Sequence, residues 1–110
     1  MEKNYMLTAA QIGTIGEVHA TEWLKAKGYS CYRNTQLPGA TDIEANGNPT
    51  SLLVQVKTAV WPSSAASLSA EEKKAIVARA NKNQRQAWLA QLQINNKGEV
   101  VGDIAWTRLN

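Results

Sequence analysis

Gln55 and Lys57 are the residues of this chain whose types are most unusual for their surroundings. They lie in the segment 52–57, in which all the remaining residues are leucine or valine. Because alternate residues of a strand face the same side, one face of this strand is apolar and the other carries both polar groups. A strand this apolar is usually covered on both sides, and burying an amide without a partner costs roughly 2–7 kcal/mol. This pattern indicates a functional site.

Three acidic residues are candidates to meet this pair. Asp42 and Glu44 lie two positions apart on a second expected strand, so their side chains share a face. The turn at 46–50 makes the two strands an antiparallel pair, which can place Asp42 or Glu44 across from Gln55 and Lys57. Glu17 lies on an expected helix among small and apolar neighbours, which suits a helix packed closely on the sheet with this carboxylate at its rim.

Carboxylate, amide and carbonyl oxygens are the ligands that Mg²⁺ prefers. Asp42 is expected to be the main ligand, with the side-chain oxygen of Gln55 and the backbone carbonyl of Val56 as further ligands. A metal there would polarise a phosphoryl oxygen and lower the pKa of water. Lys57 could orient or deprotonate the attacking water, or stabilise charge that develops on the phosphate. These residues therefore predict metal-dependent hydrolysis.

Capping signals and alternating polarity predict the elements that position these groups. The sequences Thr8-Ala-Ala-Gln11 and Ser69-Ala-Glu-Glu72 are capping boxes, each of which begins a helix. The expected elements are a helix over 8–28, strands over 29–34, 41–45 and 51–58, a helix over 69–81, and strands over 86–95 and 99–109. This order predicts a single α/β domain over residues 1–110, with a central mixed sheet flanked by helices.

The composition excludes several classes of protein. Cys31 is the single cysteine, so neither an intrachain disulfide nor a cysteine-based zinc site is expected. No apolar run approaches a membrane span and no signal-peptide pattern is present, which predicts a soluble, cytoplasmic protein. The net charge of +3 is compatible with a polyanionic partner without identifying one.

The segments Gly16-Glu17, Thr41-Asp42-Ile43 and 53–58 resemble motifs of the PD-(D/E)xK nuclease superfamily. The nearest likeness is to its Holliday-junction-resolvase-like and Mrr-like restriction-type members. The resemblance implies an αβββαβ core and a metal-dependent endonuclease that cleaves phosphodiester bonds, usually of DNA, with Mg²⁺ or, in its place, Mn²⁺. It also implies that Asp42 and Gln55 are metal ligands, Lys57 is the catalytic lysine and Glu17 is the helix acid.

Gln55 is the one departure from the usual pattern of the superfamily. Most members have Asp or Glu at this position, and glutamine resembles the QxK variant of the Mrr-like branch. A neutral ligand leaves less negative charge around the metal and should weaken its binding, for which Glu44 or Glu17 could compensate. Glu44 is thus either a further ligand or an exposed side chain.

DNA, duplex or branched, is the expected partner. Candidate contacts to it are Arg33, Asn34, Thr58 and Trp61. Trp61 follows the Gln55–Lys57 strand in a loop, where it could stack on a base or pack onto the core. The remaining tryptophans, Trp23, Trp88 and Trp106, are expected in the core. A homodimer is expected because a chain of 12.0 kDa offers little surface to surround duplex DNA.

Two other interpretations remain open. The chain could be a nuclease-fold DNA-binding protein that is catalytically weak or inactive, with Gln55 marking decay of the site. It could instead be an unrelated interaction domain whose motif is accidental, in which case Asp42 and Lys57 would lie far apart.

Overall fold

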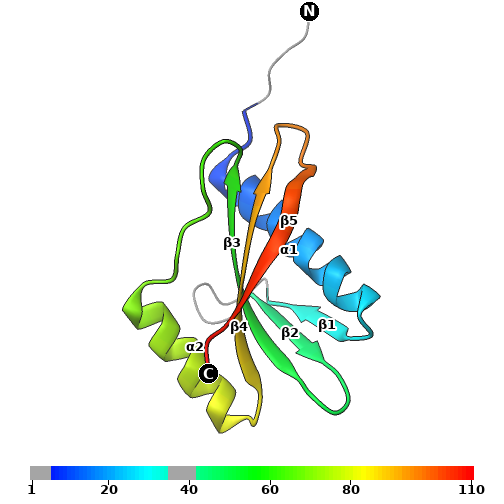
Figure 1. The fold of residues 1–110 in the computed structure, drawn as a ribbon, viewed down its shortest axis with the longest axis vertical. Coiled ribbons are helices and arrows are strands. Elements are labelled where there is room, and N and C mark those ends of the chain that lie inside the picture. Colours follow the sequence, from blue (N-terminus) through cyan, green and yellow to red (C-terminus); the bar gives the residue numbers. More distant parts are fainter. Residues whose placement is uncertain (1–5, 35–41) are drawn as a thin grey trace, which may run out of the picture.

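A mixed sheet covered by a helix on each face forms the molecule (Figure 1). The computed structural model describes residues 6–34 and 42–110. Its elements are α1 (Ala9–Ala26), β1 (Ser30–Arg33), β2 (Ile43–Asn46), β3 (Leu52–Val60), α2 (Ala70–Lys82), β4 (Gln86–Ile94) and β5 (Val100–Arg108). The five strands lie in sequence order, and only β3 and β4 are parallel among the pairs of described strands. The predicted α/β class and element order are confirmed.

Both helices begin where the capping boxes predicted. The Thr8 hydroxyl accepts from the Gln11 backbone N–H at 3.1 Å, and the Gln11 side chain accepts in return from the Thr8 N–H at 2.8 Å. Ser69 and Glu72 form the same reciprocal pair before α2. At its other end α1 stops at Lys27, and Gly28 follows with a φ of +98°, a conformation that favours glycine. No helix among the described residues is both long and apolar enough to span a bilayer.

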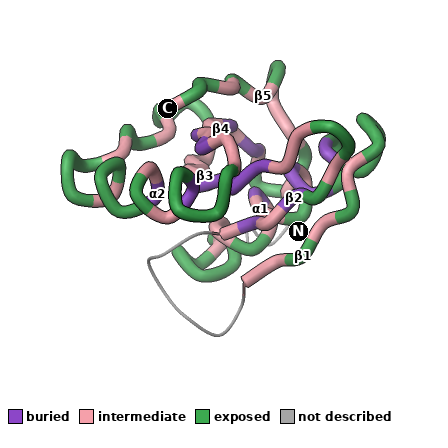
Figure 2. The backbone as a smooth tube through the Cα atoms, turned by 90° about the horizontal axis from the view of Figure 1, so that it is seen from below, coloured by how far each residue is buried: buried purple, intermediate pink, exposed green. Residues whose placement is uncertain are grey.

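The two faces of β3 pack against different helices. Leu52, Val54 and Val56 join α1 residues in one apolar cluster, whereas Leu53 packs with α2 in another. Figure 2 shows that buried residues follow β3 and β4 between the helices. Since Gln55 shares the face of Leu53, it lies on the α2 side, and only 8% of its surface is exposed. The expected burial of this polar residue is confirmed.

A glycine allows α1 to approach β3 closely. A Cβ atom added at Gly16 would overlap the hydroxyl of Thr58, which is buried against the helix. The neighbouring residue Glu17 is thereby held at the edge of the sheet. The small residues around Glu17 predicted that this helix packs closely on the sheet, and the contact between Gly16 and Thr58 agrees with that prediction.

Replacing Gly16 with alanine is therefore expected to destabilise the fold by about 1–3 kcal/mol, the usual effect of overpacking. Gly13→Ala is a matched control in the same helix, because nothing lies within 4 Å of a Cβ added there. That control should be neutral or stabilising by up to about 1 kcal/mol, since alanine is the better helix former. Urea unfolding of the two variants measures the difference, and equal effects would contradict the close approach.

Candidate active site

Asp42 directly precedes β2 and connects the start of this strand to the middle of β3. Its backbone N–H donates to the Val54 carbonyl at 3.1 Å, and its carboxylate Oδ2 accepts the backbone N–H of Val56 at 2.8 Å. The β2–β3 register ends at the Ile43–Val54 pair, so the side chain of Asp42 takes the place of the next backbone acceptor. The expectation that Asp42 lies within the strand was wrong by one residue, since β2 begins at Ile43.

Burial shapes the electrostatics of this carboxyl group. Burial raises the pKa of Asp42, while the N–H of Val56 and the charge of Lys57 oppose the rise and the charge of Glu72 adds to it. Lys57 and Glu72 come from different elements and both act on this carboxyl group. Because Asp42 accepts the N–H of Val56, the residue before Lys57, Asp42 and Lys57 do not lie far apart, as the accidental-motif interpretation required.

Glu17 lies at the rim of α1 and faces the same region. Burial raises the pKa of Glu17, the charge of Asp42 raises it further, and Arg33 opposes both effects. The guanidinium Nη2 of Arg33 lies 3.4 Å from Glu17 Oε1, with both side chains partly buried. Arg33 partly neutralises Glu17, and the repulsion that remains between the charges of Glu17 and Asp42 favours the binding of a further cation beside them.

Gln55 and Val56 offer uncharged oxygen atoms on the strand that Asp42 contacts. The N–H and C=O groups of one strand residue point to the same side of the strand, so the carbonyl of Val56 points toward the edge where Asp42 accepts its N–H. Within residues 6–34 and 42–110, no three His, Cys, Asp or Glu side chains gather closely enough to hold a metal. Hard cations also accept amide and carbonyl oxygens, however, and this donor set of Asp42, Gln55 and Val56 fits Mg²⁺ chemically.

Lys57 forms an ion pair that was not predicted from the sequence. Its Nζ lies 2.8 Å from Oε2 of Glu72, the residue that also caps α2 through Ser69. The hydrogen bond from Lys57, followed by that from Ser69, lowers the pKa of Glu72. The capping box predicted where Glu72 lies on the helix. It carried no signal for the contact with Lys57, which arises only when α2 packs across β3.

Glu44 is directed elsewhere. It pairs with Leu53 rather than with Gln55 or Lys57, and its Oε1 lies 4.0 Å from Arg79 of α2. Of the two acids proposed to face the polar strand residues, Asp42 contacts that part of β3 through the N–H of Val56, whereas Glu44 has Arg79 as its charged partner.

The four residues expected to contact nucleic acid occupy different surroundings. The ion pair with Glu17 holds Arg33, and the N–H of Asn34 donates to the Asp42 carbonyl at 2.9 Å. The hydroxyl of Thr58 is buried against Gly16, whereas Trp61 is 58% exposed directly after β3. Arg33 and Asn34 thus border the acids, and only Trp61 presents a large exposed surface.

The arrangement of strands and helices defines a restriction-endonuclease-like fold of the resolvase type. No family model matches the sequence, and no curated protein matches it. Among solved structures, the chain is similar to Hjc, a Holliday junction resolvase from the archaeal hyperthermophile Archaeoglobus fulgidus, with a TM-score of 0.68 and 22% sequence identity. The match covers 88% of this chain and 72% of that one. At this identity the likeness establishes the fold.

Proposed function

We propose that this chain is a metal-dependent endonuclease of the PD-(D/E)xK type, in its QxK variant, that hydrolyses phosphodiester bonds of DNA. One observation carries the proposal: the carboxylate of Asp42 accepts the backbone N–H of Val56 at 2.8 Å. Val56 lies between Gln55 and Lys57 in the sequence, so this contact brings Asp42 to both residues. The resolvase-like fold supports it. A single domain over residues 1–110 is part of the same proposal.

Asp42, the side-chain oxygen of Gln55 and the carbonyl of Val56 would hold Mg²⁺, or Mn²⁺ in its place. Glu17 is a further candidate ligand because its charge interacts with that of Asp42. Glu44 is less suited, since it faces Arg79. A bound divalent metal supplies Lewis-acid activation of the phosphoryl oxygen and of the attacking water. Arg33 forms an ion pair with Glu17, one of these two acids.

Lys57 would stabilise the negative charge that develops on the phosphate. A fixed ammonium group is effective in this role only if its position is set before the reaction. Glu72 provides that constraint, because its carboxylate accepts from Lys57 with one oxygen and from the N–H of Ser69 with the other. We therefore add Glu72 to the site as a positioning residue that connects the start of α2 to the lysine on β3.

Branched DNA is the proposed substrate class. Hjc is a Holliday junction resolvase, and this chain shares its fold. The net charge of +3 favours a polyanion, and Arg33, Asn34, Thr58 and Trp61 are the proposed contacts. We propose that the chain forms a homodimer, because resolving a junction requires two cuts and one chain carries one set of these residues. We propose the cytoplasm as its location.

Cleavage assays with labelled four-way junction, flap, duplex and single-stranded DNA test the proposal. We expect cutting of branched DNA in Mg²⁺ or Mn²⁺ and none in a chelator. If every DNA stays intact in both metals while junction DNA binds normally, the chain is a nuclease-fold binding protein without catalysis. The neutral Gln55 is the observation that favours this second candidate.

Gln55→Glu offers a test of the neutral ligand. A second carboxylate beside Asp42 should tighten Mn²⁺ binding by about 10-fold in calorimetry, because ligand charge strengthens cation binding. It should also destabilise the metal-free protein, since two buried like charges repel. Gln84→Glu adds the same charge at an exposed position after α2 and should change neither property. Unchanged Mn²⁺ affinity in Gln55→Glu would show that this position does not contact the metal.

A further inference from the structure

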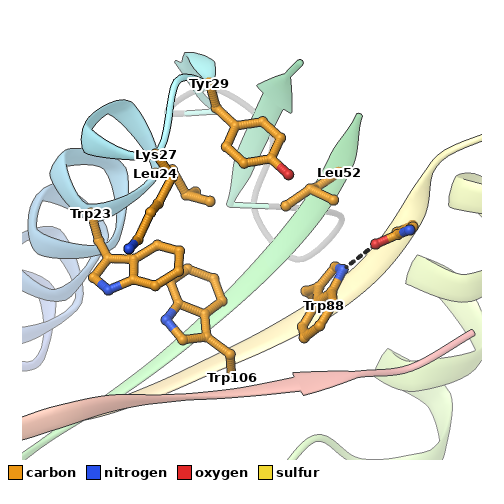
Figure 3. Close-up of a pocket in the computed structure, with 8 residues that line it drawn as sticks. Trp23, Leu24, Lys27, Tyr29, Leu52, Trp88 and Trp106 are labelled. Carbon is orange, nitrogen blue, oxygen red and sulfur yellow. Dashed lines mark hydrogen bonds between the residues drawn. The ribbon is translucent and has the colours of Figure 1, made fainter. Parts of the chain in front are cut away.

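The three tryptophans that were expected in the core line an open pocket (Figure 3). The pocket has a volume of about 350 Å³ and lies between the end of α1 and the sheet. Trp23 is 39% exposed, so the expectation that it lies in the core was wrong, whereas Trp88 and Trp106 are partly buried and pack against the core cluster. Lys27, Tyr29, Leu52 and Gln86 also line it.

The aromatic rings enclose the pocket from several sides. Figure 3 shows Trp23 and Trp106 on one side and Trp88 on the other, with Tyr29 between them at one end. The ring centroids of Trp23 and Trp106 are 4.7 Å apart. A flat aromatic molecule that entered would therefore find ring faces and edges on opposite walls, which suits stacking.

The polar groups at this pocket are mostly hydrogen-bond donors. The indole N–H of Trp106 is buried and has no acceptor among the described residues, which carries an energetic penalty. Trp88, by contrast, donates to Gln86 at 2.9 Å. The ammonium of Lys27 lies 5.1 Å from the centre of the Trp23 ring. A ligand that complements these groups is aromatic, offers an acceptor and carries negative charge.

The pocket lies near the candidate active site along two elements. Trp23 follows Glu17 by six residues on α1, which is about 9 Å along a helix. Leu52 precedes Gln55 by three residues on β3, which is roughly 10 Å along a strand, and its side chain faces α1 whereas that of Gln55 faces α2. A nucleic-acid strand that runs from the site along α1 would therefore reach the pocket.

We propose that this pocket binds an unpaired nucleotide. Its base stacks on the indole rings, a ring nitrogen or carbonyl of the base accepts from Trp106, and its phosphate lies near Lys27. The choice of a nucleotide rests on the proposed function, because a branched-DNA substrate supplies unpaired bases. Binding of a single nucleotide requires neither the metal nor cleavage, so the two proposals can fail separately.

Tryptophan fluorescence offers a direct test with deoxyadenosine monophosphate as the probe. In a Trp61→Phe background every remaining tryptophan lines the pocket, so the emission reports on it alone. We expect saturable quenching by the nucleotide and none by deoxyribose 5-phosphate, together with a shift of the Trp106 indole N–H signal in NMR spectra. The same binding is expected in a chelator and in Asp42→Asn.

Two variants identify the groups involved. Trp106→Phe keeps an aromatic ring but removes the donor, and should weaken nucleotide binding by up to about 10-fold. Lys27→Met removes the charge and should weaken it several-fold, whereas Lys25→Met, outside the pocket, should not. Urea unfolding verifies that each variant is folded. The proposal is overturned if quenching is absent, if deoxyribose 5-phosphate quenches equally, or if both pocket variants bind the nucleotide like the parent.

Discussion

Replacing Asp42 with asparagine is expected to reduce metal-dependent DNA cleavage at least about 100-fold, because the proposed metal loses its charged ligand. Asparagine is the informative substitution here. Its side-chain oxygen can still accept the N–H of Val56, so the connection between β2 and β3 is kept while the charge is removed. Single-turnover cleavage of junction DNA measures the effect, and gel-shift titration in a chelator verifies that DNA binding remains.

The same substitution is expected to stabilise the metal-free protein at neutral pH by about 1 kcal/mol, a common gain when a functional site loses its strain. Folding raises the pKa of Asp42, so the folded protein binds a proton more readily than the unfolded chain. Wild-type stability therefore falls as the pH rises from the unfolded pKa, about 3.9, through the raised folded value. Asparagine does not titrate, so the stability that Asp42→Asn gains over the wild type should appear as the pH rises through that window and should vanish below it.

Urea unfolding at neutral and acidic pH measures this gain, and Asp103→Asn on the exposed part of β5 is the control. If Asp42→Asn cleaves junction DNA at the wild-type rate, Asp42 is not a metal ligand and the nuclease proposal fails. If cleavage is lost without any gain in stability, the electrostatic account of the buried carboxyl group is wrong while its role as ligand stands.

Lys57→Met is expected to reduce the single-turnover rate by about 100- to 1,000-fold, the usual effect of removing one group that stabilises transition-state charge. Glu72→Gln should reduce the rate less, by about 10-fold, because the lysine stays but is held by a weaker neutral partner. Both variants should bind metal with nearly normal affinity, since neither residue is a proposed ligand.

Glu71→Gln is the matched control for Glu72, since the two residues are neighbours in the first turn of α2 and Glu71 is exposed. A positioning role predicts that Glu72→Asp recovers part of the rate and that the pH profile of Glu72→Gln differs from that of the wild type. If Glu72→Gln and Glu71→Gln lower the rate equally, the effect belongs to the helix terminus and not to the ion pair.

Local signals in the sequence were sufficient for the elements of this fold. Each capping box uses two side chains three residues apart, so Thr8 and Ser69 mark the helix starts without knowledge of the rest of the chain. The alternation around Gln55 likewise predicted a buried strand, because the period of two is a property of the strand itself.

Contacts between elements could not be predicted in the same way. The Lys57–Glu72 pair depends on how the crossover returns along β3, and the contact of Asp42 with Val56 depends on β2 beginning two residues later than expected. The tryptophans fit the helical and strand periods of core residues. Periodicity gives the face on which a side chain lies and not whether that face is filled.

The hydrogen bond between Asp42 and Val56 makes one backbone amide a reporter on the candidate site. A side-chain carboxylate there completes a ladder that the backbone of β2 leaves unfinished. Deuterium exchange at the Val56 amide therefore follows the opening of this carboxylate from the sheet, whether or not DNA is cut. A ligand that fixes the carboxylate in place would slow this exchange, and one that draws it away from the strand would accelerate it.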